Sequence, residues 1–324
     1  MISSAFINNG CEDSLYNDEC NTFLNYLNEC DKDITESFLD MKSKTDFITL
    51  ESEIMGNISY DNMIVLESEN KNFIEKIGSK IIEITKKFAE FVSSIVDKIK
   101  DIAFKFKSNE KKMDILLKEH PELAKEKIQI LCDEGGLEFK DISSLSDLDK
   151  EFDKIVKLAK EGKEDPNSLK ARWRKASKKW INPDDDRVTK VKKIAAAGTA
   201  TLSLITAIAF IKKEFAKNKR DLTNANQANK EHEATILHMM NHDPNSKVNQ
   251  NSGYFTLLLA MHRERNGCYA KATQHNMSLI NRMTNSIARV ADKAAGSKAG
   301  KAVFGDLKDN YMRDLVHAAD VGNR

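Results

Sequence analysis

The most constraining feature of this sequence is a long series of apolar residues at alternating spacings of three and four. The series predicts an amphipathic helix over residues 71–107, roughly 55 Å long at 1.5 Å per residue. This spacing is the heptad pattern by which helices pack along a shared seam. Charged residues fill the opposite side, so we expect the stripe to lie against sister helices or a partner chain. The packing stripe consists of Ile74, Ile77, Ile81, Ile84, Phe88, Phe91 and Ile95.

The composition and the residues that begin and end helices favour an all-α fold. The 324 residues include only four prolines and 13 glycines, so few positions interrupt a helix. Ser146 and Gly162 bracket one predicted helix, and Asp165 followed by Pro166 is typical of the start of the next. Besides the long amphipathic helix, which is expected to join a helical bundle, the pattern predicts helices over residues 21–28, 111–120, 122–133, 146–161, 254–265, 269–293 and 306–319.

The distribution of charge divides the chain into four predicted segments. Residues 1–56 carry twelve Asp and Glu against three Lys, which suggests an acidic, loosely ordered arm. Residues 57–163 would form a helical domain around the long heptad helix. Residues 164–193 are a basic linker or helix that contains both tryptophans. Residues 194–324 would form a C-terminal helical bundle that begins with an apolar helix.

Six cations and two tryptophans gather within residues 170–180, which makes this block the leading candidate for a binding surface. Its cations suit nucleic-acid phosphates, with the indoles on bases. They equally suit anionic lipid, with the indoles at the headgroup boundary. In a third interpretation the tryptophans fill a core and the cations are merely solvated, and the sequence leaves all three open. The block consists of Lys170, Arg172, Trp173, Arg174, Lys175, Lys178, Lys179 and Trp180.

A run of eighteen residues without a charge follows at 194–211, with lysines on both sides. Its length meets the lower limit for a membrane span. Its many Gly, Ser and Thr residues weaken that interpretation, and a helix of this kind also packs closely inside a protein core. We therefore keep a buried core helix and a membrane-inserting helix as alternatives. The large apolar residues of the run are Ile194, Leu202, Leu204, Ile205, Ile208, Phe210 and Ile211.

No pattern in the sequence indicates catalytic chemistry, and we predict no catalytic, cofactor-binding or metal-binding residues. His238 and His242 are four residues apart, but no third ligand is evident beside them. The glycines lack the spacing and the GKS or GKT ending of a phosphate-binding loop. Five cysteines, an odd number without close pairs, suit a reducing compartment better than a disulfide framework.

One stretch resembles a known group of proteins. Residues 59–69, with the sequence SYDNMIVLESE, lead directly into the Ile, Lys and Phe-rich amphipathic helix. This arrangement, over residues 57–107, resembles the N-terminal regions of poorly characterised virion proteins of large tailed bacteriophages. The resemblance implies an internal or structural protein of the particle, made in the host cytoplasm and packaged beside DNA. It implies no catalytic residues.

Two functional hypotheses follow from the sequence. The leading one is a non-enzymatic virion protein that contacts other virion proteins or further copies of itself through helices, and contacts DNA through the basic block. The alternative is a membrane-active protein that docks on an anionic membrane with the Trp and Lys block and inserts the 194–211 helix.

Overall fold

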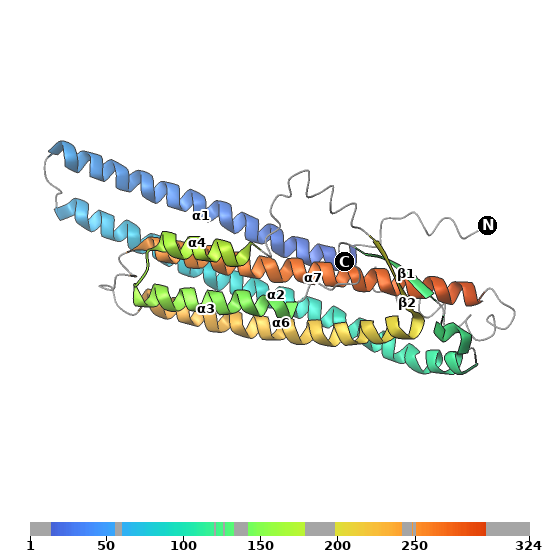
Figure 1. The fold of residues 1–324 in the computed structure, drawn as a ribbon. Coiled ribbons are helices and arrows are strands. Elements are labelled where there is room, and N and C mark those ends of the chain that lie inside the picture. Colours follow the sequence, from blue (N-terminus) through green and yellow to red (C-terminus); the bar gives the residue numbers. More distant parts are fainter. Residues whose placement is uncertain are drawn as a thin grey trace.

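The computed structural model describes residues 14–55, 60–119, 121–125, 127–132, 142–178, 198–241, 248 and 251–295. The fold is all-α, as the sequence predicts, with one small two-stranded ribbon added (Figure 1). The long helices are α1 (Ser14–Met55), α2 (Tyr60–Glu119), α6 (Leu204–Asn241) and α7 (Ser252–Ala295). The shorter elements are η1 (Pro121–Lys125), β1 (Lys127–Cys132), η2 (Ile142–Leu145), α3 (Ser146–Glu161), α4 (Pro166–Ser177) and β2 (Gly198–Ser203).

The four long helices lie side by side, and the hairpin of α3 and α4 covers one side of them (Figure 1). Ion pairs from Glu19 to Lys98 and from Asp33 to Lys80 fix the antiparallel register of α1 on α2. One continuous core contains buried residues of α1, α2, α3, α4, α6 and α7. The four segments expected from charge therefore share a core among the described residues, and none of their boundaries separates one core from another.

The heptad stripe of α2 is the centre of this core. Six of its seven residues are buried, and Ile74, nearest the start, is half-buried. Phe91 stacks on Phe23 of α1 with ring centroids 5.1 Å apart, and Phe88 meets the same ring at a tilt, at 5.7 Å. Phe88 also meets Tyr269 of α7 edge-on. The predicted packing stripe is confirmed. The helix that carries it is longer than predicted, because α2 also includes the separate helix expected at 111–120.

The N-terminal region corrects the expectation of one short helix in a loose arm. The helix predicted over 21–28 is only part of α1, which has 42 residues. Cys20, Phe23, Leu27 and Cys30 are all buried and follow one another at spacings of three and four. Because cysteine is among the residues most often buried, its two positions complete an apolar stripe that the acidic composition conceals.

The apolar run at 194–211 is not a single helix. Residues 198–203 form β2, which pairs antiparallel with β1, so the helix predicted over 122–133 is also wrong. Both segments alternate, with Thr199 and Thr201 in one and Ile128 and Ile130 in the other, which favours strands. In the part of the chain that the structure describes, no helix is long and apolar enough to cross a membrane.

The remaining residues of that run have mixed surroundings. Leu204 and Ile211 are buried in the first turns of α6, while Ile205 is 48% exposed. Leu202, Ile208 and Phe210 are half-buried against the core, and Ile194 lies outside the described residues. The run thus starts a core helix only from residue 204 onward.

Local signals at the α3–α4 turn are mostly confirmed. Gly162 ends α3 in the left-handed conformation, with φ of 61°. Asp165 caps α4 by accepting a hydrogen bond from the Asn167 amide at 3.0 Å, and Pro166 takes the first helical position. Ser146 does not cap α3, because the N-cap position is Leu145.

The C-terminal helices predicted over 254–265 and 269–293 are one helix, α7. Gly267 lies inside it. A Cβ at this glycine would stand 3.6 Å from Leu27 of α1, so the glycine marks a close helix contact rather than a break. The helix predicted over 306–319 lies outside the described residues.

Candidate polyanion-binding site between α4 and α7

The basic block forms most of α4, and it has two unlike sides. Leu169, Trp173 and Ser177 follow one another at intervals of four and are buried against the bundle. Lys170, Arg174 and Lys178 follow at the same interval and are exposed. Helix periodicity thus places the apolar residues inside and the cations outside. Lys179 and Trp180 lie outside the described residues.

Trp173 corrects the prediction of an indole at a lipid or nucleic-acid surface. Its side chain is only 3% exposed, and its ring meets Phe152 of α3 edge-on, with centroids 5.9 Å apart. The indole Nε1 donates a hydrogen bond to Glu264 Oε2 of α7 at 2.5 Å. The core interpretation therefore holds for this tryptophan. The four-residue spacing from Leu169 to Trp173 is the sequence signal that indicates it.

The exposed cations differ in their partners. Arg172 pairs with Glu151 of α3, and this hydrogen bond raises the pKa of its guanidinium. Within the described parts of the chain, no ion pair neutralises Lys170, Arg174, Lys175 or Lys178. The solvent side of α4 therefore presents four cations that form no ion pair with the described residues.

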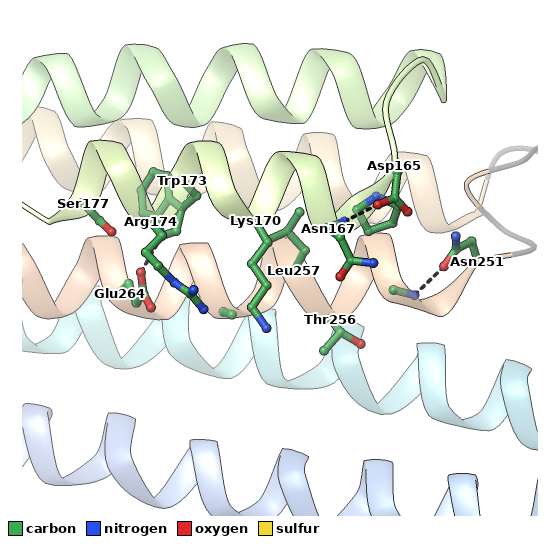
Figure 2. A pocket seen from close by; sticks show the side chains of 13 residues that line it. Asp165, Asn167, Lys170, Trp173, Arg174, Ser177, Asn251, Thr256, Leu257 and Glu264 are labelled. Atoms are coloured by element: carbon green, nitrogen blue, oxygen red, sulfur yellow. Dashed lines mark hydrogen bonds between the residues drawn. The ribbon is translucent and has the colours of Figure 1, made fainter.

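A groove of about 530 Å³ lies between α4 and α7, beside these cations. Figure 2 shows Lys170 and Arg174 extending from α4 across the groove, with Leu257 of α7 beside Lys170 and Thr256 of α7 below it. Asp165 and Asn251 lie at one end, and Glu264 lies toward the other. A guanidinium binds a phosphate or carboxylate in a fixed two-pronged geometry, and an ammonium adds a mobile charge. Because the carboxylates of Asp165 and Glu264 line the groove itself, an anionic group would be held at the rim, by Lys170 and Arg174.

A second polar cluster lies inside the bundle, at residues that no sequence pattern singles out. The side chain of Arg265 on α7 has no exposed surface. Its Nε donates to Asp149 of α3 at 2.6 Å, and its Nη1 donates to Asn229 of α6 at 2.7 Å. Tyr269 donates its hydroxyl to the second oxygen of Asp149 at 2.6 Å. This network joins three helices through one charge pair, in which Arg265 is buried and Asp149 is partly exposed.

The polar cluster continues along the contact between α6 and α7. Asn276 donates to Asn218 at 3.0 Å, and both amides are buried. Burial, followed by the negative charge of Asp149, raises the pKa of Tyr269, so the phenol remains a hydrogen-bond donor at neutral pH. Buried polar groups of this kind fix the register of packed helices, because a slip would leave them unpaired.

The cysteines and histidines considered as metal ligands are spread over the bundle. Cys20, Cys30 and Cys268 are buried and not joined in disulfides. Burial raises the pKa of the Cys20 thiol to about 12, which keeps it in the protonated form that neither attacks electrophiles nor binds metal well. His238 is exposed on α6, and His242 lies outside the described residues. Within the described ranges no three potential ligands converge.

The fold and this site define an all-α helical-bundle protein that carries a row of exposed cations on α4 beside a groove of mixed charge. Comparisons with protein-family models, with curated proteins and with solved structures found no match to this chain.

Proposed function

We propose that this chain is a non-enzymatic structural protein that binds the phosphate backbone of DNA through the exposed side of α4. The observation that carries the proposal is the exposure of Lys170, Arg174, Lys175 and Lys178, none of which forms an ion pair with the described residues. We propose that the protein acts inside a phage particle, as the resemblance of residues 57–107 implies.

The spacing of the cations supports contact with a linear polyanion. Lys170, Arg174 and Lys178 are four residues apart, so they rise by about 6 Å per step along one side of the helix. A row of this kind can meet several successive phosphates, which bind through charge without reading sequence. The buried Trp173 supplies no exposed ring for stacking on bases. We therefore expect binding that is sensitive to salt and indifferent to sequence.

The long helices support a further role in contacts with other chains. Gly78 of α2 lies against Met240, one residue before α6 ends at Asn241. Residues 60–77 of α2 therefore extend beyond the end of α6 by about 25 Å, together with the second half of α1 (Figure 1). Leu39, in α1, is 58% exposed. A projecting helical hairpin offers a surface for another virion protein or a further copy.

The membrane-inserting alternative depended on one continuous helix over 194–211. Residues 198–203 belong to strand β2 instead, and Trp173 is buried. The alternative required an apolar helix over 194–211 and an exposed indole at Trp173, and the structure has neither. We therefore do not propose membrane insertion.

Retention of the purified chain on immobilised duplex DNA tests the proposal. We expect retention at low salt, and we expect Lys170→Gln, Arg174→Gln and Lys178→Gln together to abolish it. A matched control carries Lys154→Gln, Lys157→Gln and Lys160→Gln, which remove the same charge from the exposed side of α3. Equal loss in both triple variants would attribute binding to net charge alone and contradict a site on α4. Mass spectrometry of purified particles tests the proposed setting separately.

A further inference from the structure

Beside its apolar packing on the core, the α3–α4 hairpin meets the long helices through polar contacts around two buried histidines. His232 of α6 is 8% exposed and His262 of α7 is fully buried. His232 Nε2 lies 2.7 Å from Asp153 of α3, and His262 Nε2 lies 3.1 Å from the hydroxyl of Thr85 on α2. Phe152 of α3 packs between them, 4.6 Å from one ring and 6.4 Å from the other.

The surroundings of both rings suit neutral imidazole and oppose imidazolium. Nδ1 of His232 and Nδ1 of His262 are buried, and neither has a hydrogen-bond partner among the described residues. A protonated ring carries an N–H on both nitrogens, so protonation would leave a buried donor unpaired. The guanidinium of Arg265 adds a like charge to the same interior.

The charged groups that face the histidines come from two helices. Asp149 and Asp153 face them from α3, and Arg265 faces them from α7. Asn229 of α6 and Thr85 of α2 contribute neutral polar groups. Burial first, and then Arg265, lowers the pKa of His262 well below its ordinary value. The same two causes lower the pKa of His232, although Asp153 and Asp149 oppose them.

We propose that this cluster is an acid-sensitive clasp, which holds the α3–α4 hairpin on the bundle while His232 and His262 are neutral and releases it when they are protonated. In the closed form Asp149 binds Arg265 and Tyr269, and Asp153 binds His232. Protonation of both histidines would add two positive charges to this interior. Of the two facing carboxylates only Asp153 could balance them, because Asp149 already binds the guanidinium of Arg265 and the hydroxyl of Tyr269. Release lets water solvate every one of these groups.

The direction of the pH dependence follows from proton binding. Above about pH 6.5, the ordinary pKa of histidine, both rings are neutral in either form and the clasp is at full strength. As the pH falls below that value, the released form takes up protons that the closed form resists. The equilibrium then moves toward release by up to about 100-fold per pH unit, tenfold for each histidine.

Trp173 reports the release directly. Its indole lies on the inner side of the hairpin, buried against the bundle, and donates to Glu264 of α7 in the closed form; release therefore transfers it to water and shifts its emission to the red. Trp180→Phe leaves Trp173 as the one tryptophan of the chain, which has two. The experiment follows emission and far-ultraviolet circular dichroism of this full-length variant from pH 7.5 to pH 5, a range above the ordinary pKa of carboxyl groups. We expect the emission to shift while the helical signal persists.

Three variants identify the groups responsible. His262→Gln keeps a polar side chain near Thr85 without a titrating ring, so the transition should become about tenfold rather than 100-fold per pH unit. Asp153 is 62% exposed, so Asp153→Asn should fold normally. This variant should move the transition to higher pH. It removes the carboxylate that stabilises protonated His232 in the closed form, so the closed form resists protons more strongly. His238→Gln, at an exposed ring on the same helix, is the matched control and should change nothing.

Constant Trp173 emission over this range would overturn the proposal. A red shift of the emission accompanied by loss of the helical circular-dichroism signal would also overturn it, because that result indicates unfolding of the whole bundle. Unaltered transitions in both His262→Gln and Asp153→Asn would show that other groups are responsible.

Discussion

Removing the carboxylate of Asp149 should be among the most destabilising single changes in this chain. Asp149→Asn leaves the guanidinium of Arg265, which has no exposed surface, without a charged partner among the described residues; the neutral Asn229 and the ring of Tyr269 remain beside it. Breaking one partner out of a buried ion pair costs roughly 3–5 kcal/mol, because the remaining charge stays desolvated. The Tyr269 hydroxyl keeps an acceptor in the new amide, so we expect a loss toward the lower end, about 3 kcal/mol.

Thermal and urea unfolding followed by circular dichroism measure this loss. Asp147→Asn is the matched control, since that side chain is 80% exposed on the same helix and, among the described residues, forms an ion pair with Lys150 alone. It should cost less than about 0.5 kcal/mol. The double variant Asp149→Asn with Arg265→Met removes the stranded charge, so it should be more stable than the sum of the single changes predicts. A loss below about 1 kcal/mol for Asp149→Asn, or additive single changes, would refute the account of this buried pair.

Three further predictions concern other contacts. Trp173→Phe should lower the free energy of unfolding by about 1–3 kcal/mol, because it removes the hydrogen bond to Glu264 and part of a buried ring; chemical denaturation measures this. Gly267→Ala should raise stability by up to about 1 kcal/mol, since the added methyl group meets Leu27 at an ordinary 3.6 Å, and a lower melting temperature would contradict that contact. The Cys20 thiol, with its pKa raised to about 12 by burial, should react with a thiol reagent at pH 8 only after denaturation.

The parts of the fold that depend on local pattern were predictable. The heptad stripe of α2 has seven members between Ile74 and Ile95, each three or four positions from the next. The caps at Gly162 and Asp165 likewise involve neighbours only a few positions away. Hydrophobic periodicity and capping chemistry act over these short distances, so the sequence contains their signal directly.

The parts that depend on distant partners were not predictable in the same way. Strand β2 exists because residues 198–203 meet residues 127–132, about seventy positions earlier, and the run alone looks like an apolar helix. Arg265 looks like an ordinary surface cation on a helical stripe. Its acceptor Asp149 lies 116 positions away, so the sequence offers no local reason to bury it.

The candidate site was predicted in part. Lys170, Arg174, Lys175 and Lys178 are exposed, as a binding surface requires, whereas Trp173 faces inward. Composition identified the block, but the assignment of each residue to a side of α4 needs the phase of the helix. The groove against α7 also needs Glu264 and Leu257, which lie some ninety residues further along the chain.

The salt dependence of DNA affinity tests the proposed function most directly. If Lys170, Arg174 and Lys178 each neutralise one phosphate, the logarithm of the association constant should fall with the logarithm of salt concentration with a slope of about −3, and the α4 triple variant should lose nearly all of that slope. A slope near zero in the unaltered chain, or one of equal size in the α4 triple variant, would contradict a phosphate-binding role for α4.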